Sequence, residues 1–262
     1  MSAIILDNEI VHYEVLGRGR PVIFLHGWVG SWRYWIPAMQ VVSTSFRAYA
    51  LDFWGFGGSA KESNRYLLSN QKQLLNDFLY ELGIGKIALI GHGLGAIIAL
   101  MFAEQYPLLV DRVMAISMPL ETGLISPRMQ QLPPAELADW LLGANPEAQA
   151  ARAEAPKADQ VAILRSLNNL NSDEITQRPQ RLRVPCLLVN GLNDPAISLP
   201  DQQQVDNLPA STHLITFDRC GHFPMLDRPG KFNRLMNDFL TLESGQNPSQ
   251  LQLKEEWKRR LR

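Results

Sequence analysis

The chain has 262 residues, 46% of them hydrophobic and 19% charged, and a formal net charge of −1 at pH 7. The length allows one large domain with a sizeable core, and the balanced charge argues against nucleic acid or an anionic membrane as a general partner. No run of about 18 apolar residues occurs, so the sequence predicts no membrane span. The first residues lack a basic segment followed by a long apolar stretch, so we expect a cytoplasmic protein without a signal peptide.

The two cysteines, Cys186 and Cys220, lie far apart in the sequence and lack the spacing of metal ligands. We expect two free thiols in a reducing compartment, with a single disulfide as the less favoured alternative. The sequence implies neither a metal nor an organic cofactor.

Strand-like runs alternate with helical patterns over the first 118 residues. Residues 9–15 alternate between apolar and polar side chains, which predicts a half-buried edge strand. Residues 86–92 form a continuous apolar run, as is typical of the middle of a parallel sheet. The further elements that we expect are strands at 22–27, 46–52 and 110–118, and helices at 32–43, 70–83 and 94–107.

The alternation stops between residues 119 and 183, which are rich in Leu, Ala, Gln and Pro and have the pattern of short helices. It resumes with strands at 184–191 and 212–218 and a final helix near 229–242. Regular alternation on both sides of one interruption predicts a mostly parallel, doubly wound α/β sheet with an inserted helical cap.

We therefore expect a core, a cap and a C-terminal segment. Their predicted bounds are 1–118 and 184–243 for the core, 119–183 for the cap, and 244–262 for a linker with a C-terminal helix. In that last helix Leu253, Trp257 and Leu261 recur at every fourth position and form one apolar stripe. The stripe favours a helix docked on the core, and a contact with a partner or a membrane surface is the alternative.

The segment "LIGHGLG" (89–95) joins the 86–92 strand to the following helix. A strand, then G-x-x-x-G, then a helix is typical of a nucleophile elbow, in which small flanking residues let strand and helix approach closely. Gly91 and Gly95 supply those residues, and the backbone N–H of Leu94 would point at a developing oxyanion. The nucleophile position itself is Gly93, which has no side chain.

Other polar residues follow predicted strands in the same way. "FLHGWVGS" offers the N–H of Trp28 as a second oxyanion donor, and "LDFWGFGGS" runs from Asp52 to Ser59 in a Gly-rich loop. "NGLND" places Asp194 just past a strand, where a carboxylate can orient an imidazole, and "DRCGHFPMLDRP" places His222 in a loop after the last strand.

With these segments in this order, the chain resembles the α/β-hydrolase fold superfamily over residues 9 to 242. The resemblance implies that Asp194 is the acid and His222 the base, with the amides of Trp28 and Leu94 as oxyanion donors. It also implies a small-molecule substrate.

Gly93 departs from the family pattern, which has Ser, or sometimes Asp or Cys, at this position. Without a side chain at 93, no acyl-enzyme can form there, and loss of a triad nucleophile costs about 10⁶-fold in kcat in a reference protease. Three hypotheses follow: a carboxylesterase-type hydrolase with reduced or absent activity, a His–Asp general-base enzyme of lyase or oxygenase type, or a non-catalytic ligand-binding protein.

Some of these residues also have a structural interpretation. We expect His26 and His92 to pack and hydrogen-bond around the elbow rather than to ionise, and Cys220 to be a packing residue. Asp194 has the alternative role of capping a helix after Pro195.

The predicted cap is rich in apolar side chains that would line a lipophilic cavity or pack onto the core. They include Leu120, Leu124, Ile125, Met129, Leu132, Leu137, Trp140 and Leu141. This composition favours an uncharged, moderately hydrophobic ester or a related carbonyl compound as the substrate.

Overall fold

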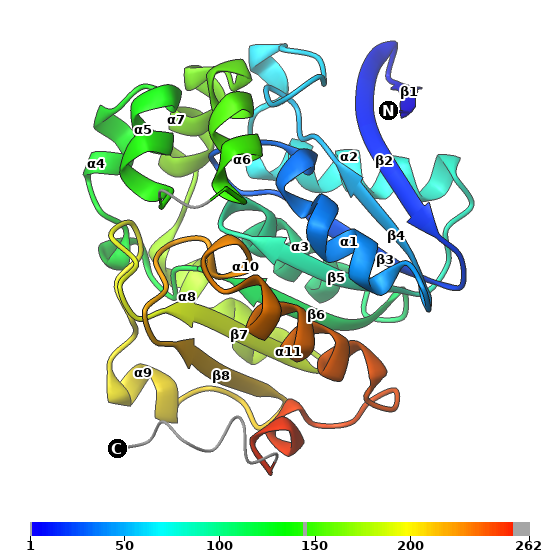
Figure 1. Cartoon of the computed structure of the whole chain (residues 1–262), viewed down its shortest axis with the longest axis vertical. Coiled ribbons are helices and arrows are strands. Elements are labelled where there is room, and N and C mark those ends of the chain that lie inside the picture. The colour runs from blue at the N-terminus through cyan, green and yellow to red at the C-terminus, as the bar shows by residue number, and fades with distance from the viewer. Residues whose placement is uncertain (1, 144–145, 254–262) are drawn as a thin grey trace.

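A computed structural model of the chain describes residues 2–143 and 146–253. Figure 1 shows one twisted sheet with helices packed on both of its faces, so the predicted fold class is confirmed. The predicted C-terminal stripe that includes Trp257 and Leu261 lies outside the described residues. Within the part that is described, no helix is both long and apolar enough to cross a membrane.

The sheet has eight strands in the order β1-β2-β4-β3-β5-β6-β7-β8. The strands are β1 (Ser2–Leu6), β2 (Glu9–Gly17), β3 (Arg20–Leu25), β4 (Phe46–Leu51), β5 (Ile87–His92), β6 (Val110–Ile116), β7 (Cys186–Gly191) and β8 (Thr212–Phe217). β1, β2 and β4 pair antiparallel, and all other pairs from β4 to β8 are parallel. Every residue of β5 and β7 is buried, which explains their apolar sequences.

The hairpin of β1 and β2 was not expected from the sequence. Asp7 and Asn8 form a two-residue connection between the paired residues Leu6 and Glu9, and both have positive φ, at 49° and 63°. Such a turn favours Asn and Asp, so this dipeptide is the signal that identifies the hairpin. The prediction that the strand at 9–15 lies at the sheet edge is therefore wrong, because β1 covers it.

Helices cover both faces of the sheet (Figure 1). α1 (Ile36–Val42) packs against α11 (Pro229–Thr241) on one face, whereas α3 (Leu94–Gln105) packs against α2 (Leu68–Glu81) and α8 (Ser172–Arg181) on the other. The remaining short elements of the core are the helices α9 (Gln202–Asp206) and α10 (Pro224–Asp227) and the 3-10 turns η1 (Trp32–Trp35), η2 (Ser63–Arg65) and η5 (Pro248–Leu253).

Between β6 and β7 the described residues form helices, which we call the helical segment. It comprises η3 (Thr122–Leu124), α4 (Arg128–Gln131), α5 (Pro134–Leu141), α6 (Ala148–Glu154), η4 (Ala155–Lys157), α7 (Gln160–Asn168) and α8. In Figure 1, α4 to α7 lie together beyond one end of the strands, and their contacts reach the loops that follow β3 and β4. The bounds of the predicted core and cap stay a prediction.

Gly91 and Gly95 let β5, β3 and α3 approach closely, as the elbow pattern predicts. A Cβ on Gly91 would lie 2.3 Å from the carbonyl oxygen of Gly95, and one on Gly95 would lie 2.3 Å from the carbonyl oxygen of Leu25. Neither backbone can move without displacing the elbow, so both positions exclude a side chain.

We expect Gly95→Ala to lower the free energy of unfolding by about 1–3 kcal/mol through overpacking, as measured by urea denaturation. The matched control is Gly230→Ala in α11, where an added Cβ meets nothing within 4 Å. Equal stability of the two variants would contradict the close approach at the elbow.

Candidate active site

The elbow connects β5 to α3 in a sharp turn at Gly93, whose φ is 50° and ψ is −110°. The Gly93 N–H donates to the carbonyl of Ile116 at 2.9 Å, and the Gly95 N–H donates to the carbonyl of His26 at 3.0 Å. Leu94 begins α3, and amides of a first helical turn have no acceptor within the helix. The turn therefore presents a helix N-terminus, which is suited to an anion, at a position without a side chain.

His222 and Asp194 form a buried pair. His222 Nδ1 lies 2.8 Å from Asp194 Oδ2, and the two side chains are only 1% and 2% exposed. Because a carboxylate accepts, the shared proton belongs to Nδ1, which leaves a lone pair on Nε2. This tautomer is the one that a general base requires.

The second oxygen of Asp194 caps the following turn. Oδ1 accepts the N–H groups of Ala196 and Ile197 at 2.8 and 3.1 Å. These contacts close a turn rather than a helix, since the next helix, α9, begins only at Gln202. The role of Asp194 as the acid stays a prediction. The capping contacts fix the carboxylate, so Oδ2 remains directed at His222.

The His222 loop is tied directly to the elbow. His92 Nε2–H donates to the carbonyl of His222 at 2.8 Å, and Ser117 Oγ–H donates to the same oxygen at 2.9 Å. The His92 and His222 rings lie 4.7 Å apart. The structure therefore brings His222 against His92, the residue before Gly93, although the two histidines are widely separated in the sequence.

Tyr34 connects the elbow to the loop that carries Trp28. Its hydroxyl accepts the N–H of Gly27 at 2.7 Å and donates to His92 Nδ1 at 3.0 Å. Burial raises the pKa of Tyr34 well above its usual value and lowers the pKa of His92 well below its own, so both stay neutral. The sequence analysis missed Tyr34, because a tyrosine in a predicted helix has no local feature that marks this role.

His26 is a structural residue, as the sequence predicts. Nδ1–H donates to the carbonyl of Gly27 at 2.7 Å, and Nε2 accepts the N–H of Phe53 at 3.0 Å. Burial lowers the pKa of His26 to about 4, so the ring is neutral at physiological pH. The free thiols Cys186 and Cys220 are also buried, and burial raises their pKa values to about 12 and about 11.

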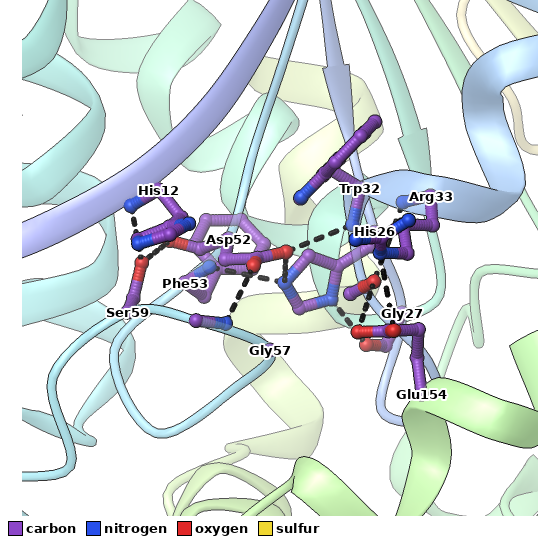
Figure 2. A network of polar contacts seen from close by, with 12 residues as sticks. His12, His26, Gly27, Trp32, Arg33, Asp52, Phe53, Gly57, Ser59 and Glu154 are labelled. Carbon is purple, nitrogen blue, oxygen red and sulfur yellow. Dashed lines mark hydrogen bonds and ion pairs between the residues drawn. The ribbon is translucent and has the colours of Figure 1, made fainter. Parts of the chain in front are cut away.

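Asp52 organises the Gly-rich loop after β4 (Figure 2). Oδ1 accepts the N–H of Trp32 at 2.8 Å and Oδ2 accepts the N–H of Gly58 at 2.9 Å. Ser59 Oγ donates to the backbone carbonyl of Asp52 at 2.8 Å and accepts the N–H of His12 at 3.0 Å. Burial raises the pKa of Asp52 to about 7, against these two N–H donors, which lower it. Asp52 and Ser59 thus stabilise the backbone of this loop by hydrogen bonds.

The Trp28 side chain lies against Gly93 and is fully buried. Its indole Nε1–H donates to Ser166 Oγ of α7 at 3.0 Å. The backbone of Trp28 follows Gly27, whose own N–H is engaged by Tyr34. Both predicted oxyanion donors therefore lie at Gly93. The ring of Trp28 packs against it, and Leu94 follows it in the chain.

Comparison with known proteins identifies hydrolases as relatives. A family model described as "Alpha/beta hydrolase family" matches residues 22–235. The chain is similar to 2-hydroxy-6-oxo-2,4-heptadienoate hydrolase of Pseudomonas putida, at 28% identity over 260 residues that cover 87% of this chain and 91% of that protein.

Solved structures with the same fold include an esterase and a second hydrolase. The esterase EaEST from Exiguobacterium antarcticum has a TM-score of 0.78 at 17% identity, covering 91% of this chain and 98% of that one. A hydrolase from Pseudomonas aeruginosa has a TM-score of 0.80 at 17% identity, covering 92% and 98%. At these identities the likeness concerns the fold alone.

Tyr34→Phe should lower the free energy of unfolding by about 1–3 kcal/mol, because the Gly27 N–H and His92 Nδ1 both lose a buried partner. Urea denaturation measures the effect. Tyr80→Phe, at a side chain that is 85% exposed, is the matched control and should leave stability unchanged. A loss no larger than that of the control would mean that the Tyr34 hydroxyl contributes nothing.

Asp52 should make stability depend on pH. The pKa is 3.8 in its ordinary state and about 7 in the fold, so the contribution of protonated Asp52 is complete below pH 3.8 and lost as the pH rises through 7. We expect the unfolding free energy of wild type, minus that of Asp52→Asn, to fall as the pH rises from 3.8 to about 7 and to level off above it.

The control for this experiment is Asp206→Asn, the same chemical change at an exposed residue. Its difference from wild type should stay constant over that range. A constant difference for Asp52→Asn as well would contradict a raised pKa at this carboxyl.

Proposed function

This chain belongs to the alpha/beta hydrolase family, and we propose that it hydrolyses a small uncharged ester or related carbonyl compound with water as the nucleophile. The observation that carries the proposal is the His222–Asp194 hydrogen bond of 2.8 Å, buried beside an elbow that lacks a side chain. Both residues of the base, His222 and Asp194, are present, whereas the nucleophile side chain that they would activate is absent at Gly93. Activity is therefore reduced relative to an enzyme with a serine at this position.

The proposed reaction uses His222 as a general base. Nε2 removes a proton from water while the water oxygen attacks the carbonyl carbon of the substrate, whose π electrons move to the carbonyl oxygen. Asp194 accepts the hydrogen bond from Nδ1–H of His222 and stabilises the imidazolium that forms. The oxyanion then re-forms the carbonyl, the bond to the alcohol oxygen breaks, and this oxygen takes the proton from Nε2. Acid and alcohol leave, and His222 is neutral again.

The backbone amides of Trp28 and Leu94 are the proposed oxyanion donors. Leu94 lies at the N-terminus of α3, where the helix dipole stabilises negative charge. The amides of its two neighbours, Gly93 and Gly95, already donate to backbone carbonyls. Preorganised donors of this kind account for much of the residual rate in enzymes whose nucleophile has been removed.

The substrate class rests on the apolar surroundings and on the relatives. Several apolar side chains of the helical segment, including Met129 and Leu137, are buried, which supports an uncharged ligand. The name of the Pseudomonas putida relative denotes hydrolysis of a carbonyl compound, and EaEST is an esterase. We extend this chemistry to the present chain as part of the proposal.

A non-catalytic ligand-binding protein is the second candidate. The 1% exposure of His222 favours it, because burial restricts access to the base. Such a protein would bind its ligand without turnover. The following experiment decides between the two candidates.

The test is hydrolysis of p-nitrophenyl acetate and butyrate. Wild type should turn over slowly without a burst or labelling by a serine-directed phosphonate, and His222→Ala should lower kcat/KM by about 10²–10⁴-fold. His213→Ala, at the opposite end of β8, is the matched control and should retain activity.

Gly93→Ser tests the missing nucleophile. Turnover confined to this variant, with a burst and phosphonate labelling, would contradict water as the nucleophile and identify an esterase that lacks one hydroxyl. If every folded form is inert, the ligand-binding candidate replaces the hydrolase.

A further inference from the structure

The Trp28 ring packs tightly against the position that a side chain at residue 93 would take. A Cβ added to Gly93 would lie 3.1 Å from both Cε3 and Cζ3 of Trp28. This separation is shorter than the ordinary contact distance of about 3.5–4.0 Å between carbon atoms. The ring would therefore have to shift by a few tenths of an ångström to admit a side chain at residue 93.

Ser166 holds the ring in this position. Its hydroxyl accepts from Trp28 Nε1 at 3.0 Å and donates to the carbonyl of Ile163 at 2.9 Å, so it acts as donor and acceptor at once. Ser166 is fully buried in α7, whereas Trp28 belongs to the loop after β3. The orientation of the indole is thus set by a hydrogen bond from the core to the helical segment.

The same loop has a second connection to the helical segment. Arg33 Nε lies 3.1 Å from Glu154 Oε1 of α6, and Ser31 Oγ lies 3.3 Å from Glu154 Oε2 (Figure 2). Glu154 fixes the backbone of the loop on the helical segment. With the loop held, the Trp28 ring remains over Gly93 unless the indole itself rotates and gives up Ser166.

We propose that the Trp28 side chain, fastened by Ser166, determines the size of the acyl group that reaches the His222–Asp194 pair. The inference rests on the proposed function and adds the residue that sets its substrate range. A bulky aromatic ring beside the reacting carbonyl leaves room for a short acyl group only. Loosening or shortening this side chain therefore admits longer ones.

The first arm of the test measures kcat/KM for p-nitrophenyl acetate, butyrate and octanoate. Wild type should favour acetate, and Ser166→Ala and Trp28→Leu should each raise the octanoate-to-acetate ratio by about tenfold or more. Both variants keep the backbone N–H at residue 28, which is a proposed oxyanion donor. Ser172→Ala in α8 is the matched control for Ser166→Ala and should leave the ratio unchanged.

The second arm requires no turnover, so it separates failure of this inference from failure of the proposed function. Butanone and 2-decanone, which are uncharged ketones that cannot be hydrolysed, are titrated while the ¹⁵N–¹H signal of the Trp28 indole is followed. Its absence in Trp28→Leu assigns the signal. We expect Ser166→Ala to bind 2-decanone about tenfold more tightly than wild type, with butanone unchanged, and to exchange its Trp28 indole proton faster.

Two results would overturn the inference. One is an unchanged ratio of ester activities together with unchanged ketone affinities in Ser166→Ala and Trp28→Leu. The other is no binding of either ketone by any form, which would mean that no acyl site lies under the ring. If no form hydrolyses an ester but Ser166→Ala binds 2-decanone more tightly than wild type, the inference about Trp28 is supported. Only the proposed hydrolysis is then contradicted.

Discussion

A buried chain of hydrogen bonds from Gly27 through Tyr34 and His92 to the carbonyl of His222 is the interaction on which the site depends. It joins the loop after β3, the turn after β5 and the loop after β8. Each donor meets an acceptor, and none of these groups has access to water, so removal of one member leaves its neighbours unsatisfied. The position of the base relative to the elbow follows from this chain.

The three glycines of the elbow differ in what surrounds them. Gly91 and Gly95 exclude side chains because backbone atoms lie 2.3 Å from where a Cβ would be. Gly93 differs from them, because its neighbour is the ring of Trp28 and its φ of 50° costs an L-residue about 1–3 kcal/mol. Glycine at this position relieves the strain and leaves room for the ring.

The helical segment does more than cover the site. Through Ser166 it orients the indole of Trp28, and through Glu154 it holds Ser31 and Arg33. In the proposed reaction, the helical segment would exclude bulk water from the base. The proposed reaction and the proposed substrate range both depend on this segment.

Local patterns in the sequence were sufficient for the strands β2 to β8, the elbow and the order of Asp194 and His222, because periodicity and turn chemistry depend on neighbours along the chain. The strand β1 was not predicted, because Asp7 and Asn8 indicate a hairpin turn only once the pairing of β1 with β2 is known. The link through Tyr34 and the contact of Trp28 with Ser166, 138 residues away, were decided by tertiary packing alone. Such contacts depend on which segments the fold brings together, and no local pattern records that.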